Sequence, residues 1–195
     1  MDIAIQVVPA RRVGDDRAEA FPKPDGHLLV LADGAGGTSG GAAAADAVLD
    51  GTRSFSPKSS SDCVRLLKEL DQRLTNVGQT TAVLTVVANG EVFGASVGDS
   101  SAWLLTAAGV VDLTHRQKPK PLLGSGSAMP IGFGPLPCVG RLLIGSDGLF
   151  KYVQHERIRD LASKLPLDEA AAALIGAARL RSGALQDDIA VIVVG

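Results

Sequence analysis

Residues 82–97 read Ala82-Val-Leu-Thr-Val-Val-Ala88-Asn89-Gly90-Glu91-Val-Phe-Gly-Ala-Ser-Val97. Two apolar runs of strand length flank an Asn-Gly pair in this stretch. That pair is the strongest short-range signal for a β-hairpin, because both positions of its tight turn need positive φ angles. The stretch therefore predicts two antiparallel strands, over residues 82–88 and 92–97, joined by a short turn.

Similar apolar runs, bounded by turn residues, recur on both sides of this hairpin. They cover residues 3–8, 27–32, 102–105, 140–145 and 189–194. Residues 107–109 indicate another turn, so the centre of the chain predicts an antiparallel meander. Residues 118–140 are rich in Pro and Gly and predict one long surface loop.

Helical periodicity is confined to four blocks of the sequence. They are residues 41–49, 62–74, 156–165 and 168–180, with Pro166 between the last two. The order of strands and helices is not the strict alternation that builds a doubly wound parallel sheet, and it favours an α+β layered sandwich. With 195 residues and neither an internal repeat nor a linker, the chain predicts a single domain over residues 1–195.

Composition and the N-terminal sequence exclude several classes of protein. The chain has 19 basic and 21 acidic side chains, a formal net charge of -2, which gives no footprint for nucleic acid or an anionic membrane. The N-terminus lacks the basic head and apolar run of a signal peptide, and no apolar stretch reaches the roughly 20 residues of a spanning helix. We therefore expect a cytoplasmic protein. Cys63 and Cys138 are isolated in sequence, so we expect buried free thiols rather than a disulfide or a zinc site.

Aspartates stand at the ends of several predicted strands. They are Asp33, Asp99, Asp147 and the pair Asp187-Asp188. Each is also an ordinary turn former when taken singly. Taken together they predict a cluster, and clustered carboxylates cannot all stay ionised without a counter-charge. A divalent cation is the usual counter-charge, and oxygen ligands without Cys or His favour Mg²⁺ or Mn²⁺ over zinc.

These aspartates lie within four longer motifs. The motifs are Leu31-Ala-Asp-Gly-Ala-Gly-Gly37, Ser96-Val-Gly-Asp-Ser-Ser-Ala102, Ile144-Gly-Ser-Asp-Gly-Leu149 and Asp187-Asp-Ile-Ala-Val-Ile-Val-Val194. In content and order they resemble the metal-dependent protein phosphatases of the protein phosphatase 2C family, including short bacterial members related to sporulation and stress-response phosphatases. The resemblance implies a four-layer α-β-β-α sandwich, with two antiparallel sheets flanked by helix pairs and a binuclear Mg²⁺ or Mn²⁺ centre at the sheet edges.

The resemblance also implies metal ligands within the motifs. Asp33 would bridge the two ions, and Gly34 would offer its carbonyl oxygen to one of them. Asp147 and Asp187 would complete the coordination of the other ion.

A further family element, an arginine followed by an acidic pair, is best matched by residues 11–16. By this resemblance Arg11 or Arg12 would bind the substrate phosphate at the catalytic site, where the bidentate fork of a guanidinium suits phosphate. Asp15 or Asp16 would face the metal ions. The sequence leaves both choices open.

Among the departures from the family pattern, those at Asp99's site and at Ala35 bear on the chemistry. Asp99 would help to hold a third ion, but Lys151 stands where the family often has a second aspartate at that site, which leaves a third ion in doubt. Ala35 stands where some members carry a histidine proposed as a general acid, although many bacterial members also lack it.

The expected function is hydrolysis of phosphoserine and phosphothreonine in a phosphorylated protein, such as a kinase or a regulatory phosphoprotein. The departures leave open a second interpretation, a catalytically silent pseudo-phosphatase that acts as a protein-binding module. A nucleotide-phosphate loop over residues 34–40 is disfavoured, because Ser39 takes the place of the third glycine in Gly-x-Gly-x-x-Gly.

Overall fold

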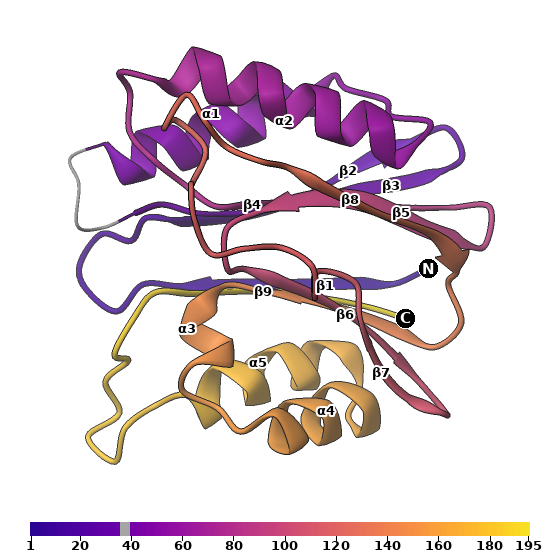
Figure 1. Ribbon diagram of the computed structural model, residues 1–195. Helices are drawn as coiled ribbons and strands as arrows, with labels where there is room; N and C mark the ends of the chain where they lie inside the picture. Colours follow the sequence, from indigo (N-terminus) through magenta and orange to yellow (C-terminus); the bar gives the residue numbers. More distant parts are fainter. Residues whose placement is uncertain (36–39) are drawn as a thin grey trace.

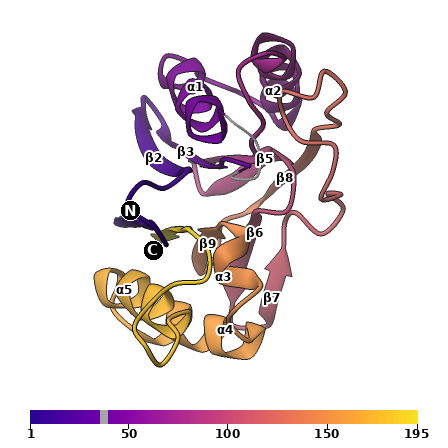
Figure 2. The same ribbon diagram turned by 90° about the vertical axis from the view of Figure 1, so that its left-hand side faces the viewer.

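A computed structural model describes residues 1–35 and 40–195. Residues 36–39 lie outside the described residues, and with them the end of the first motif and the middle of the glycine segment 34–40. Within the described part, ten strands form two antiparallel sheets that face each other, and a pair of helices covers the outer face of each sheet (Figures 1 and 2). The predicted four-layer α+β sandwich is confirmed.

One sheet contains both ends of the described chain. Its strands, in spatial order, are β1 (Ile3–Val8), β10 (Ile189–Val194), β9 (Arg141–Gly145), β6 (Ser101–Thr106) and β7 (Gly109–Asp112). The other sheet has the order β2 (Asp16–Lys23), β3 (Gly26–Asp33), β4 (Ala82–Ala88), β5 (Glu91–Val97) and β8 (Ile131–Pro137).

The helices lie on the two outer faces (Figure 1). The helices α1 (Gly41–Arg53) and α2 (Ser60–Leu74) cover the sheet that contains β3, while α4 (His155–Lys164) and α5 (Leu167–Ala177) cover the sheet that contains β10. A single turn, α3 (Asp147–Phe150), follows β9. Within residues 1–35 and 40–195, no helix is both long enough and apolar enough to cross a bilayer.

The continuous apolar sequence of the central strands follows from this layering. In β3, Leu28 and Val30 pack toward α1 and α2, whereas Leu29 and Leu31 pack between the two sheets. Successive side chains of a strand point to opposite faces. A strand buried on both faces is therefore apolar at every position.

The Asn-Gly hairpin is confirmed, and it joins β4 to β5 with φ angles of 52° at Asn89 and 76° at Gly90. The predicted meander is wrong beyond this hairpin. The strands β5 and β6 belong to different sheets, because the chain crosses between the sheets at Asp99. The predicted turn at residues 107–109 does join β6 to β7.

The predicted long loop over residues 118–140 is also wrong, because it contains β8. This strand pairs with β5 alone and forms the edge of its sheet. An edge strand tolerates proline, since the N–H groups on its outer side make no hydrogen bond to a neighbouring strand. Pro135 and Pro137 therefore hide a strand that the apolar pattern does not reveal.

Both cysteines lie in the described residues and are free thiols. Cys63 is buried, as predicted, and its side chain packs in the core from the buried face of α2. Cys138 is only half-buried at the end of β8, which corrects the expectation that both are buried.

Candidate metal and phosphate site

Carboxylates from both sheets meet at one end of the sandwich. Asp33 ends β3 and lies opposite Asp16, the first residue of β2, in the antiparallel register. Asp147 begins α3 directly after β9, and Asp187 lies two residues before β10. Because β9 and β10 are antiparallel neighbours, the end of one lies beside the start of the other. Figure 2 views the molecule from this end, with α3 toward the viewer.

A pocket of about 370 Å³ opens between these strand ends. Its lining includes five residues that the sequence predicts at a metal site: Asp33, Gly34, Asp99, Asp147 and Asp187. As the side chains stand, no three His, Cys, Asp or Glu groups among the described residues converge closely enough to hold a single ion. The backbone therefore gathers the carboxylates around one pocket, and an ion held there would need rotation of these side chains to complete its coordination.

Burial and mutual repulsion act on these carboxyl groups. Burial raises the pKa of Asp33, and the charges of Asp16 and Asp147 raise it further. Burial also raises the pKa of Asp16, whose side chain is only 2% exposed. Within the described residues, Oδ2 of Asp16 is buried without a hydrogen-bond partner. A buried carboxylate oxygen of this kind is costly unless a cation pairs with it.

Two threonines hold the backbone of Asp33 in place. Oγ1 of Thr80 donates to the Asp33 carbonyl oxygen at 2.9 Å, and the Asp33 amide donates to Oγ1 of Thr81 at 3.1 Å. Thr81 is itself fixed by a 2.7 Å hydrogen bond with Ser100, next to Asp99. The strand end that carries Asp33 is therefore rigidly placed relative to the Asp99 turn.

The loop before β2 carries the predicted arginines and the acidic pair. Arg11 and Arg12 are both exposed on this loop. Asp16 is buried opposite Asp33, whereas Asp15 is half-buried, and its carbonyl oxygen accepts a 3.3 Å hydrogen bond from the Gly34 amide. Of the two aspartates, Asp16 is the one whose side chain lies within the carboxylate cluster.

Asp188 fixes that loop, a role that the sequence interpretation did not assign. Its Oδ1 accepts from the Ala10 amide at 2.7 Å, and its Oδ2 accepts from the Asp15 amide at 2.6 Å. A Cβ atom at Gly14 would lie 2.7 Å from the same Oδ2, so the loop needs glycine at this close approach. In the sequence, the only indication of a role for Asp188 was its position next to Asp187.

Arg17 holds the same loop from its other side. Its Nη1 donates to the carbonyl oxygens of Gly14 and Asp16, at 2.9 and 2.8 Å. Its Nε pairs with Asp46 of α1 at 2.5 Å. Because these contacts depend on how β2 lies beside α1, local sequence carried no signal for them.

Two lysines bring positive charge to the pocket. Lys120 lines it from the segment that precedes β8. Lys151, the residue after α3, makes an ion pair with Oδ2 of Asp147. The sequence interpretation treated Lys151 only as a departure from a family pattern, and it did not single out Lys120.

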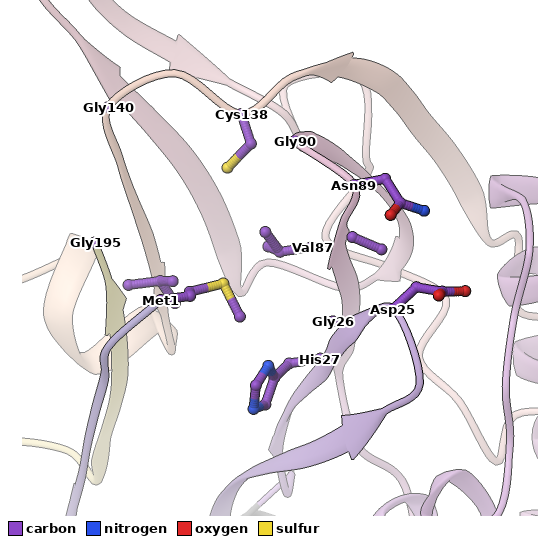
Figure 3. Close-up of a pocket in the computed structure, with 12 residues that line it drawn as sticks. Met1, Asp25, Gly26, His27, Val87, Asn89, Gly90, Cys138, Gly140 and Gly195 are labelled. Carbon is purple, nitrogen blue, oxygen red and sulfur yellow. The ribbon is translucent and has the colours of Figure 1, made fainter.

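A larger pocket, of about 440 Å³, lies at the opposite end of the sandwich (Figure 3). The side chains of Met1, His27, Val87 and Cys138 surround it, with Asp25 at its side. Gly26 and His27 begin β3, whereas Asp33 ends it, so the two pockets are separated by the length of that strand. The carboxylate cluster, and the chemistry it supports, belong to the smaller pocket.

Comparisons with known proteins complement this geometry. The family model described as stage II sporulation protein E (SpoIIE) matches residues 23–195. A search of curated protein sequences gave no match.

Several solved structures share the fold. A bacterial serine phosphatase is 22% identical with a TM-score of 0.84, over 99% of this chain and 96% of that chain. Serine/threonine phosphatase Stp1 from Staphylococcus aureus is 21% identical with a TM-score of 0.82, over 98% of this chain and 93% of that chain. The catalytic domain of serine threonine protein phosphatase PstP, solved in complex with two manganese ions, is 21% identical with a TM-score of 0.80, over 98% and 96%.

Proposed function

Because this chain belongs to the stage II sporulation protein E (SpoIIE) family, we propose that it is a metal-dependent serine/threonine protein phosphatase. In this proposal residues 1–195 act as one catalytic domain, and the substrate is a phosphorylated protein. The observation that carries the proposal is the group of carboxylates that both sheets deliver to one pocket. The manganese-bound PstP structure of the same fold supports it.

The donor set fits Mg²⁺ or Mn²⁺. Every predicted side-chain ligand is a carboxylate, and hard divalent ions prefer oxygen ligands. The buried, unpaired Oδ2 of Asp16 and the raised pKa values of Asp16 and Asp33, caused first by burial, fit a site that needs a cation nearby. When bound, such ions would supply Lewis acidity for the activation of water and would offset the charge of the phosphate.

The residues of this chain would divide the remaining work. Asp33 would bridge two ions, with Asp16 beside it and the Gly34 carbonyl oxygen directed to one of them. Asp147 and Asp187 would hold the second ion. The rigid placement of the Asp33 backbone by Thr80 and Thr81 would keep the bridge in position.

Substrate binding would fall to the loop before β2. Arg11 or Arg12, both exposed on a loop that Asp188 anchors, would bind the phosphoryl oxygens and orient the phosphate. Asp99 would be the ligand of a third ion, if one binds. It lies on the side of the pocket where Lys120 and Lys151 add positive charge.

The test is hydrolysis of an aryl phosphate and a phosphothreonine peptide with Mn²⁺, with Mg²⁺ and with chelator. We expect turnover that depends on the metal and is lost in Asp33→Asn and in Asp147→Asn. Asp160→Asn, which changes a partly exposed carboxyl on α4 that does not line the pocket, serves as the matched control and should keep full activity. Equal turnover in the presence of chelator, or in the Asp147→Asn variant, would refute the proposal.

The ion pair between Lys151 and Asp147 favours a second candidate, a catalytically silent protein-binding module. A silent module that has lost its metal centre should bind Mn²⁺ no better than the Asp147→Asn variant does. Calorimetric titration with Mn²⁺ therefore separates the two candidates without reference to turnover.

A further inference from the structure

Lys151 lies where its side chain must meet Asp147. It follows the last residue of α3, and its amide donates to the Asp147 carbonyl oxygen at 2.8 Å. This helical turn puts the two side chains on the same face, as residues four apart always are in a helix. The ammonium forms an ion pair with Oδ2 of Asp147.

The charge of Lys151 reaches beyond that single contact. Its ammonium lowers the pKa values of Asp99 and Asp187, against the burial that raises both. Asp147, Asp99 and Asp187 all line the pocket, and they come from three different strand ends. One ammonium therefore partly neutralises the side of the pocket that these three carboxylates form.

The side chain of Lys151 is exposed enough to leave Asp147 for solvent. Its side chain is 53% exposed, whereas that of Asp147 is 16% exposed. The aliphatic stem reaches in from solvent, and the charged end can return to water by rotation about its side-chain bonds. The carboxylate, in contrast, belongs to the first residue of α3 and stays at the pocket.

We propose that Lys151 is a built-in counter-ion of this site, which holds Asp147 until a divalent ion displaces it. The proposal rests on the proposed function in one respect, that Asp147 is a metal ligand. Because the ammonium at Oδ2 of Asp147 repels a divalent ion bound to the same carboxylate, the lysine competes with the metal and weakens its binding. The positive charge also opposes a further cation between Asp99 and Asp147.

Direct measurement of Mn²⁺ binding tests this competition. Free Mn²⁺ is followed by electron paramagnetic resonance during titration of the wild type and of Lys151→Met, which keeps the stem and removes the charge. Lys164→Met is the matched control, because Lys164 also pairs with an aspartate four residues away, Asp160, but on α4. We expect Mn²⁺ to bind about two- to fivefold more tightly to Lys151→Met, the range set by an exposed ion pair, and equally to Lys164→Met and the wild type.

Salt and a second substitution sharpen the test. The advantage of Lys151→Met should shrink as ionic strength rises, because salt screens an exposed ammonium. Lys151→Asp, which replaces the ammonium by a carboxylate, should bind Mn²⁺ at least as tightly as Lys151→Met does. Circular dichroism establishes that each variant is folded.

The outcomes separate this inference from the proposed function. Mn²⁺ that binds to the wild type, is lost in Asp147→Asn and is unchanged or weaker in Lys151→Met overturns the inference and leaves the metal site in place. Absence of Mn²⁺ binding in the wild type and in every Lys151 variant overturns both.

Discussion

Replacing Asp71 should release the segment that runs from the pocket to β8. Asp71 lies in α2, and its side chain is 2% exposed. Its Oδ1 accepts from the amides of Gly124 and Gly126, at 2.8 and 3.1 Å, and its Oδ2 accepts from the Ala128 amide at 3.0 Å. One carboxylate thus holds residues 124–128 in place through three backbone amides.

The number of bonds sets the size of the effect. A hydrogen bond to a charged group contributes about 1.5–3 kcal/mol. In the variant, the freed amides of this half-exposed segment can bind water, which recovers part of the lost free energy. We therefore use about 1 kcal/mol for each bond, slightly below the lower end of that range. Asp71→Ala then lowers the free energy of unfolding by about 3 kcal/mol. Asp71→Asn keeps one oxygen that can accept two amides, so it loses one bond and lowers that free energy by about 1 kcal/mol.

For a chain of this size, 1 kcal/mol corresponds to about 2–4 °C in Tm. Thermal melts should therefore fall by about 6–12 °C for Asp71→Ala and by about 2–4 °C for Asp71→Asn. Hydrogen exchange should show loss of protection at the amides of residues 124, 126 and 128 while the strands stay protected. Asp50→Asn, an exposed change on α1, is the control and should shift stability by less than about 0.5 kcal/mol.

Two results would refute this reasoning. If Asp71→Ala unfolds within 1 °C of the wild type, water replaces the carboxylate at no cost. If Asp71→Asn and Asp71→Ala are equally unstable, the negative charge matters and the number of accepting oxygens does not.

Three further changes test other contacts. Asp188→Asn leaves one acceptor for two loop amides, so we expect KM for a phosphopeptide to rise more than kcat falls; a fall in kcat alone would contradict a role in holding the arginine loop. Ser59→Ala removes the N-cap bond to the Asp62 amide and should lower stability by about 1 kcal/mol in urea titration, with an unchanged value as the contrary result. Burial raises the pKa of the Cys63 thiol to about 12, so at pH 8 a thiol-specific reagent should label the half-buried Cys138 first, and the reverse order by mass spectrometry would count against the packing of α2.

The central strands could be predicted from sequence because both of their faces are buried. The strands β4 and β10 have the predicted bounds, since a strand covered on both faces is almost entirely apolar and the run ends where burial ends. The edge strand β1 also has the predicted bounds, although it includes Gln6 and the exposed Val7. The four sequence motifs likewise predicted the family and the layers, which the match to residues 23–195 and the shared fold confirm.

The other edge strands, β2, β7 and β8, could not be predicted in this way. The strand β2 alternates polar and apolar residues and carries four charged side chains in eight residues, Asp16, Arg17, Glu19 and Lys23. The strand β8 contains two prolines, and β7 has only four residues. An edge strand needs neither continuous apolar sequence nor a complete ladder, so its pattern resembles that of a loop.

In the candidate site, too, the residues next to buried strands could be predicted, whereas those that depend on long-range pairing could not. The strand-end positions of Asp33, Asp147 and Asp187 follow from local sequence, because each lies next to a buried strand. The choice of Asp16 over Asp15 for the cluster needed the register of β2 against β3, and β2 was not predicted at all. The role of Asp188 depends on residues 173 and 178 positions away in sequence, which only the pairing of β1 with β10 brings near.

The position of β10 between β1 and β9 has a consequence for synthesis in the cell. The strand β1 leaves the ribosome well before β10, and among the described strands it has no neighbour in its sheet until residues 189–194 emerge, with Asp187 just ahead of them. The half of the chain that carries β2 to β5 can pair its strands much earlier, since those strands follow one another along the sequence. The nascent chain therefore cannot assemble this sheet, or the pocket at its end, until β10 has been synthesised.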